Sequence, residues 1–66
     1  MLLIINGENN YLAPVASVSE LVARLALAKD RVAVEINGRI IKKPEWEATP
    51  LAEGDRIEII QFVGGG

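Results

Sequence analysis

The sequence predicts an α+β domain in which a single helix packs on one face of a β-sheet. A chain of 66 residues is one domain at most. Half of its residues are hydrophobic and 24% are charged, which excludes the disordered class. The pattern contains one capped amphipathic segment among several apolar strand-like segments. Because one helix cannot cover both faces of a sheet, a two-layer domain follows.

The first predicted element is a β-hairpin. The residues LLIIN form a short run rich in branched apolar side chains, and the run stops at Asn6-Gly7. Asn-Gly is the strongest short-range hairpin signal, because both residues tolerate positive φ. We expect the return strand over residues 10–15. Pro14 restricts this strand to an edge of the sheet, since proline cannot donate a hydrogen bond to a neighbouring strand.

The segment SVSELVARLALAK predicts the helix, over residues 18–28. Ser17 and Glu20 have the spacing of a capping box, in which each side chain accepts a free amide at the start of the helix. Lys29 lies near the expected C-terminal end, where the helix dipole favours positive charge. Four apolar residues at i, i+3, i+4 and i+7 make one helix face: Val18, Leu21, Val22 and Leu25.

Three strand segments are predicted after the helix. VAVEIN alternates and ends in a second turn signal, Asn37-Gly38, and RIIKK then forms a short strand. The segment PEWEATPLAEGD is expected to be irregular, with Trp46 packing as a lid on the edge of the core. The last strand lies in RIEIIQFV. Because the first and last strands are the most apolar, we expect them side by side in the centre of the sheet.

Alternation along the first and last strands assigns their side chains to the two faces of the sheet. The residues predicted to face the helix are Leu3, Ile5, Ile57, Ile59 and Val63. The opposite parity contains Glu58, which indicates that the second face is open to water. The residues predicted on this second face are Leu2, Ile4, Glu58, Ile60 and Phe62.

Ile60 and Phe62 would then be exposed apolar residues close to the end of the chain. An exposed apolar patch is typical of a docking surface. We therefore predict that Ile60 and Phe62, with Ile4 and Glu58 on the same face, contact a partner protein. Burial under a loop or by self-association are the alternatives for Ile60 and Phe62.

Composition excludes several classes of function. The chain has no Cys and no His, so it lacks thiol chemistry, the commonest metal ligand and the commonest general base. Ser17 with Glu20 is therefore a helix cap and not a nucleophile with its base, and we expect no bound metal or cofactor. A net charge of −2 argues against a nucleic-acid surface. No apolar run approaches the ~20 residues of a membrane helix, and MLLIING lacks a cleavage site, so we expect a cytoplasmic location.

The sequence ends in FVGGG, where an apolar strand runs directly into three glycines. Glycine has no Cβ, so such a segment is narrow and can adopt the dihedrals that a partner's channel imposes. We expect residues 64–66 to be flexible, because no side chain anchors them. A loose tail without a function is the alternative.

These features together resemble the sulfur-carrier proteins of thiazole (thiamine) biosynthesis. The resemblance covers nearly the whole chain and is most specific in INGRIIKKPEWEAT and in LAEGDRIEIIQFVGGG. It implies a single ubiquitin-like β-grasp domain over residues 1–66, with a mixed sheet of four to five strands and one helix on one face. The positions that match best are Asn37-Gly38, Trp46, Leu51, Gly54, Asp55, Ile57 and Gly65-Gly66.

The resemblance also implies that the protein is a co-substrate and not an enzyme. An E1-like adenylating enzyme would use ATP to adenylate the carboxylate of Gly66, with Gly64 and Gly65 threaded into its active site. Sulfur from a persulfide donor protein would replace AMP and leave a thiocarboxylate, which thiazole synthase would use. Three alternatives stay open: the small subunit of molybdopterin synthase, a tRNA-thiolation carrier, and a ubiquitin-like interaction module without tail chemistry.

Overall fold

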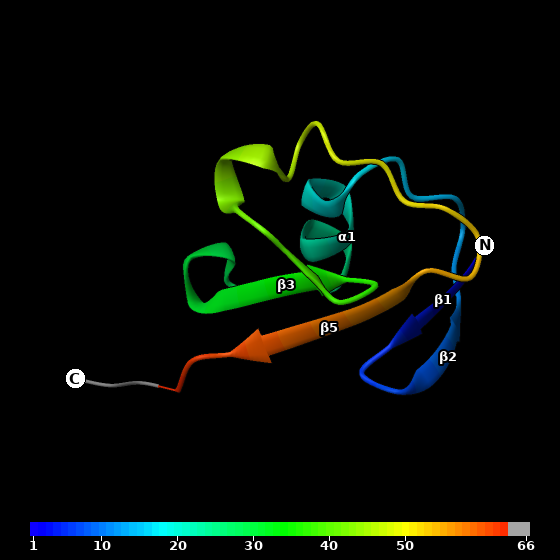
Figure 1. Ribbon diagram of the computed structural model, residues 1–66, viewed down its shortest axis with the longest axis horizontal. Helices are drawn as coiled ribbons and strands as arrows, with labels where there is room; N and C mark the ends of the chain where they lie inside the picture. The colour runs from blue at the N-terminus through cyan, green and yellow to red at the C-terminus, as the bar shows by residue number, and fades with distance from the viewer. Residues whose placement is uncertain (64–66) are drawn as a thin grey trace.

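A computed structural model describes residues 1–63 and shows a five-stranded sheet with one α-helix on one face (Figure 1). The strand order is β2-β1-β5-β3-β4, with β1 parallel to β5 and the other neighbours antiparallel. The predicted α+β class and the central pairing of the first and last strands are therefore confirmed. The elements are β1 (Leu2–Ile5), β2 (Glu8–Tyr11), α1 (Val18–Arg24), η1 (Lys29–Arg31), β3 (Val32–Ile36), β4 (Arg39–Ile41), η2 (Lys43–Glu45) and β5 (Arg56–Gln61).

Both Asn-Gly pairs form the predicted hairpin turns. Asn6 and Gly7 have φ values of 50° and 82°, and Asn37 and Gly38 have φ values of 51° and 87°. Positive φ at both central residues is the two-residue geometry that matches the twist of the flanking strands. These turns fix the register of the β1–β2 and β3–β4 hairpins.

The predicted position of β2 is wrong, although its place at an edge of the sheet is confirmed. The strand covers Glu8–Tyr11 and not residues 10–15. A two-residue turn pairs Ile5 directly with Glu8 and brings Leu2 opposite Tyr11, so β2 ends where β1 begins. Pro14 consequently lies outside the sheet.

The helix begins as predicted but ends earlier. Ser17 Oγ accepts a hydrogen bond from the Glu20 amide, and Glu20 Oε1 accepts one from the Ala16 amide, both at 3.2 Å. Helix α1 ends at Arg24 and not at residue 28, because Ala26 adopts a left-handed φ of 58°. The Ala26 amide then donates a hydrogen bond to the Ala23 carbonyl, and the Leu27 amide donates one to the Val22 carbonyl, as in a Schellman motif. Lys29 therefore lies in η1 and not at the end of α1.

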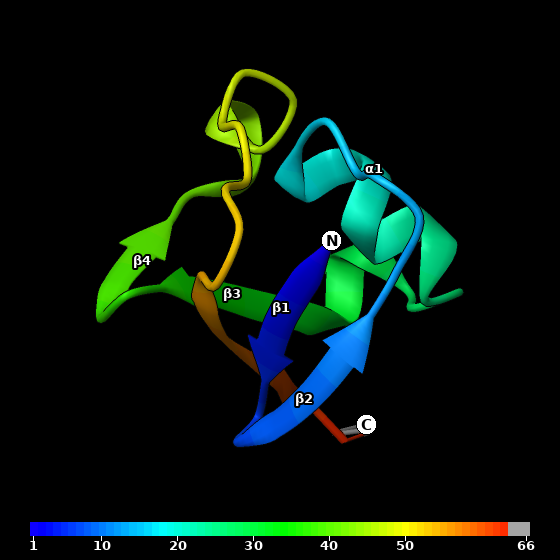
Figure 2. The ribbon, with the colours of Figure 1, turned by 90° about the vertical axis from the view of Figure 1, so that its right-hand side faces the viewer.

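The core lies between α1 and the sheet, as the view in Figure 2 shows. The predicted core positions of β1 and β5 are confirmed, except that Val63 is 95% exposed because β5 ends at Gln61. Trp46 is the predicted lid on the core edge, with its indole N–H donating to the Ile41 carbonyl at 2.9 Å. The buried apolar residues are Leu3, Ile5, Val15, Val18, Leu21, Val22, Val32, Val34, Ile36, Trp46, Ile57 and Ile59.

Candidate functional site

The candidate site is the face of the sheet that points away from α1, which we call the open face. Residues paired directly across neighbouring strands share a face, so the register shows which side chains lie there. Among the exposed large apolar side chains of residues 1–63 are Ile60 at 47%, Phe62 at 58%, Ile40 at 71% and Tyr11 at 77%. The open-face residues are Leu2, Ile4, Asn9, Tyr11, Ala33, Glu35, Ile40, Arg56, Glu58 and Ile60.

The predicted exposure of Ile60 and Phe62 agrees with the structure. Ile60 lies opposite Ala33 of β3, and the Phe62 amide donates to the Arg31 carbonyl at 2.8 Å. This bond extends the pairing with the β3 side one residue beyond β5, and the chain then leaves the body of the domain (Figure 1). We call Ala33, Ile60 and Phe62 the exit patch, because they lie where the chain departs from the sheet.

Ile4 shares the open face but lies away from the exit patch. The parallel pairing places Ile4 level with Arg56, four residues along β5 from Ile60. Four residues of strand correspond to about 13 Å. Ile4 is also only partly exposed. Glu58 lies between these two levels, so the four residues predicted to contact a partner are spread along the direction of β5, with Ile4 on the neighbouring β1, and do not form one cluster.

The turn asparagines have a second role that sequence reasoning missed, because both hold β5 in place. Beyond the end of β1, Asn6 Oδ1 accepts from the Ile59 amide at 2.8 Å, and Asn6 Nδ2 donates to the Ile59 carbonyl at 3.3 Å. The Asn6 carboxamide thus makes the two hydrogen bonds to Ile59 that the backbone of a neighbouring strand would otherwise make. The sequence signal that could have revealed this is asparagine itself, since its side chain both donates and accepts.

Asn37 does the same for the start of β5. Its Oδ1 accepts from the Arg56 amide at 3.0 Å, and its Nδ2 donates to Asp55 Oδ1 at 3.1 Å. Asp55 Oδ2 in turn accepts from the Ala52 amide at 2.8 Å, which closes the loop before β5. The start and the middle of the central strand are therefore positioned by hairpin turns that lie far away in the sequence.

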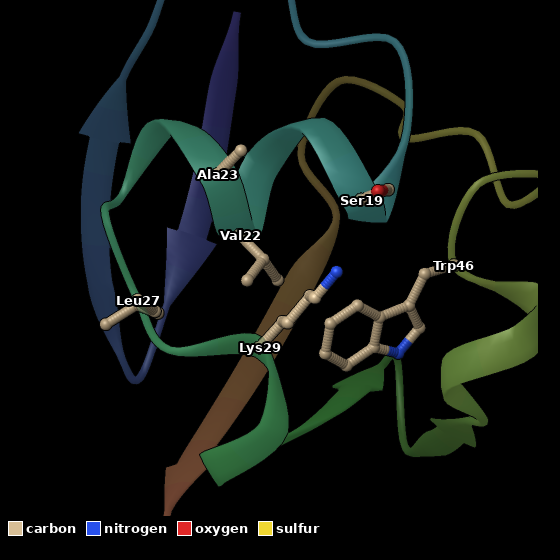
Figure 3. A pocket seen from close by; sticks show the side chains of 6 residues that line it. All are labelled: Ser19, Val22, Ala23, Leu27, Lys29 and Trp46. Atoms are coloured by element: carbon tan, nitrogen blue, oxygen red, sulfur yellow. The ribbon is translucent and has the colours of Figure 1, made fainter.

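A pocket of about 280 Å³ lies on the helix side of the domain, between α1 and Trp46 (Figure 3). Its walls are mostly apolar, and the Lys29 side chain reaches in between Val22 and Trp46. Ser19 supplies the other polar side chain of the lining. Because no carboxylate of residues 1–63 lines this pocket, Lys29 and Ser19 do not form a catalytic set in it. The pocket is also on the other side of the sheet from the exit patch.

Within residues 1–63, no group of three or more carboxylate, thiol or imidazole side chains is placed to hold a metal ion. None of the helices in this part of the chain is long and apolar enough to cross a membrane. The predicted site residues Gly64, Gly65 and Gly66, and their predicted flexibility, lie outside the described residues.

A mixed sheet with β1 and β5 parallel at its centre and one helix on one face defines a ubiquitin-like β-grasp domain. The crystal structure of a thiamine biosynthesis protein (ThiS) from Geobacter metallireducens has this fold. It matches with a TM-score of 0.83 and 35% sequence identity over the full length of both chains. The β-grasp fold implied by the sequence is therefore confirmed.

The model of the ThiS family matches residues 3–66, and the chain belongs to this family. The sulfur carrier protein ThiS of Bacillus subtilis is 35% identical over 63 residues, which cover 94% of this chain and 96% of that protein. A thiazole synthase of Paramagnetospirillum magneticum is 36% identical over 66 residues. This chain spans only 20% of that synthase, and 19% of a second thiazole synthase, from Magnetococcus marinus.

Proposed function

We propose that this protein is a sulfur carrier for the thiazole part of thiamine biosynthesis. The observation that supports this most strongly is its match to the ThiS family over residues 3–66, which includes the final glycines. A relative that is matched over 96% of its own length is named as a sulfur carrier. The exposed exit patch beside the last strand supports the same role, because a carrier must dock while its end is modified elsewhere.

In the proposed chemistry the carboxylate of Gly66 is the reacting group. A carboxylate is a poor electrophile, so an E1-like enzyme first joins it to the AMP part of ATP and releases pyrophosphate. A persulfide donor protein then attacks the acyl carbon through its terminal sulfur, and AMP leaves. A partner's thiol then attacks the donor's sulfur in the resulting acyl disulfide, forms a disulfide with it and releases the thiocarboxylate of Gly66, which thiazole synthase takes as its sulfur source.

The described structure limits where these partners can bind. Val63 is the last described residue and is 95% exposed. Three further residues reach at most about 10 Å when fully extended. With Gly66 as the reacting group, the active site that receives it would lie within about 10 Å of Val63, which favours a partner surface close to the exit patch. This geometry supports contact between Ile60, Phe62 and the adenylating enzyme.

We propose that the protein acts in the cytoplasm as a co-substrate and not as an enzyme. The two relatives named thiazole synthase contain a segment similar to this chain. A carrier-like segment joined to a thiazole synthase supports a direct relationship between these two functions. The sequence contains neither His nor Cys, which agrees with chemistry performed in the partners' active sites.

The test of the proposed function uses intact-mass measurement after incubation with ATP, the E1-like enzyme of the same organism and a persulfide source. The wild-type protein should exchange one oxygen for sulfur. Deleting Gly66, or adding a residue after it, should abolish the exchange, because a 1 Å misplacement can already cost about 100-fold in rate. Gly65→Val should act in the same direction through its side chain alone.

The control is that circular dichroism and thermal unfolding of all three variants match the wild type. If the variants are thiolated at the wild-type rate, the carboxylate of Gly66 is not the site. If the wild-type protein itself is never adenylated, the carrier function is wrong, and an interaction module without tail chemistry explains the fold better.

A further inference from the structure

The open face contains two carboxylates that lie directly opposite each other on the central strands. The antiparallel register pairs Glu35 of β3 with Glu58 of β5. Side chains in such a pair share a face, with Cβ atoms about 4.5–5.5 Å apart. Like charges directly opposite each other destabilise a sheet. The isolated domain therefore gains nothing from this arrangement.

Within residues 1–63, no basic side chain forms an ion pair with either carboxylate. The ion pairs within residues 1–63 join Arg24 to Glu20 and Lys43 to Asp30. Arg56 lies two residues before Glu58 on the same face and forms an ion pair with neither carboxylate.

Apolar side chains frame the two carboxylates. Ile40 of β4 pairs with Glu35 and is 71% exposed. Ile60 follows Glu58 by two residues on β5 and is 47% exposed, which places the exit patch about 7 Å further along the strand. A partner that covers the exit patch would therefore also cover the acidic pair and exclude water from it.

We propose that Glu35 and Glu58 together bind a basic side chain, best an arginine, of the adenylating enzyme that receives Gly66. This inference rests on the proposed function and adds the chemistry of the partner surface. A guanidinium has five donors and bonds carboxylates strongly, so one arginine can bridge both side chains. Docking then relieves the repulsion, whereas a partner without a cation at this position would bury two like charges.

The acidic pair is thus a specificity element that costs stability in the free protein. This gives two measurable effects of opposite sign. Neutralising either carboxylate should stabilise the free domain and weaken the complex. A residue with a purely structural role would change stability and binding in the same direction.

The experiment compares Glu35→Gln and Glu58→Gln with Glu47→Gln, an exposed carboxylate in the loop after η2. Thermal unfolding is measured on the free proteins, and binding to the E1-like enzyme of the same organism is measured by calorimetry. The open-face variants should raise the Tm by roughly 1–8 °C and weaken binding by about tenfold or more. Glu47→Gln should change neither quantity.

A charge reversal sharpens the test. Glu58→Lys should raise the Tm further, because the new ammonium pairs with Glu35 across the strands. It should weaken binding more than Glu58→Gln, because it repels the partner's cation. The binding constant of the wild-type protein should also fall more steeply with added salt than that of the Glu35→Gln, Glu58→Gln double variant.

Several outcomes would overturn the inference. If the glutamine variants bind as tightly as the wild type, the pair is not recognised, while thiocarboxylation of the wild type would still support the carrier function. If the wild type forms dimers that Glu58→Gln abolishes, the acidic pair contacts a second copy of the chain. A wild-type protein that is never adenylated would overturn the carrier function and this inference together.

Discussion

Ile59 and Ile60 are neighbours on β5 with the same side chain, yet they lie on opposite faces of the sheet. Ile59 is 8% exposed and packs under α1, whereas Ile60 is 47% exposed on the open face. The burial of Ile59 stabilises the fold, since each buried aliphatic side chain contributes about 1.5–3 kcal/mol. Ile60 contributes little of this in the free protein. We therefore assign the stabilisation of the fold to the face of the sheet that α1 covers, called the covered face, and the docking of partners to the open face.

The two halves of β5 differ in a second way. Ile57 pairs with both β1 and β3, whereas Gln61 pairs only with Val32 of β3, beyond the end of β1. Asn6 supports the region between them through Ile59. Strand β5 thus has two neighbouring strands, β1 and β3, near its start, and only β3 near its end.

The largest effect on unfolding free energy is expected on the covered face. Ile57 is 1% exposed in the centre of the core, so Ile57→Ala removes buried methylene and methyl groups and leaves a cavity. We expect a loss of about 2–5 kcal/mol in urea unfolding. In a 66-residue domain, this approaches the whole stability of about 5 kcal/mol for small proteins. A loss below about 1 kcal/mol would contradict the position of Ile57 in the core.

The next largest loss of unfolding free energy is expected at Asn6. Asn6→Gly keeps the positive φ of the turn but removes both hydrogen bonds to Ile59, so we expect a loss of about 1–3 kcal/mol. Hydrogen exchange at the Ile59 amide should accelerate, because Asn6 Oδ1 accepts its proton in the native fold. Asn37→Gly is the matched control at the other turn and should accelerate exchange at Arg56 instead. Unchanged Ile59 exchange in Asn6→Gly would contradict this role.

The matched change on the open face separates stability from docking. Ile60→Glu should change the unfolding free energy by only about 0.5 kcal/mol or less, as exposed positions usually do. The same variant should weaken adenylation by the E1-like enzyme, since it replaces an apolar side chain of the exit patch with a charge that docking would have to desolvate. If Ile60→Glu unfolds the domain, Ile60 belongs to the core and the assignment of faces is wrong.

Local patterns were sufficient to predict most of the fold. Asn-Gly at residues 6–7 and 37–38 specified two turns, because this pair favours positive φ at both positions. Ser17 with Glu20 specified the start of α1, and alternation around Glu58 correctly predicted that Ile60 is exposed. Each of these signals depends on residues close together in the sequence, which is why sequence reasoning could find them.

Features set by distant residues could not be predicted in the same way. Alternation along the last strand predicted that Val63 faces the helix. The backbone pairing of this segment stops at the bond between Phe62 and Arg31, just before β3 begins. Alternation in one strand does not show where its neighbour begins or ends. The register that separates Ile4 from Ile60 joins segments about fifty residues apart. The end of α1 was missed because Ala26, and not a glycine, takes the left-handed position there.

The smallest effect is expected at an ion pair that lies outside both faces of β5. Lys43 Nζ lies 2.5 Å from Asp30 Oδ1, joining η2 to η1. The hydrogen bond from Lys43, followed by its charge, holds the pKa of the Asp30 carboxyl below its ordinary value of 3.8. A pKa lowered by folding adds stability that is present above the unfolded value and is lost as the pH falls through the folded value. Both side chains are exposed, so solvent screens the pair and the change is small.

Asp30→Asn tests this directly by urea unfolding between pH 6 and a pH below the folded-state pKa of Asp30, which itself lies below 3.8. The wild type should be slightly more stable than the variant at the upper end, and the difference should vanish at the lower end. Added salt should reduce the difference at pH 6, since it screens exposed charges. Adenylation of Asp30→Asn should equal that of the wild type, because the pair lies off the open face. A stability difference that grows as the pH falls would contradict the direction of the pKa shift.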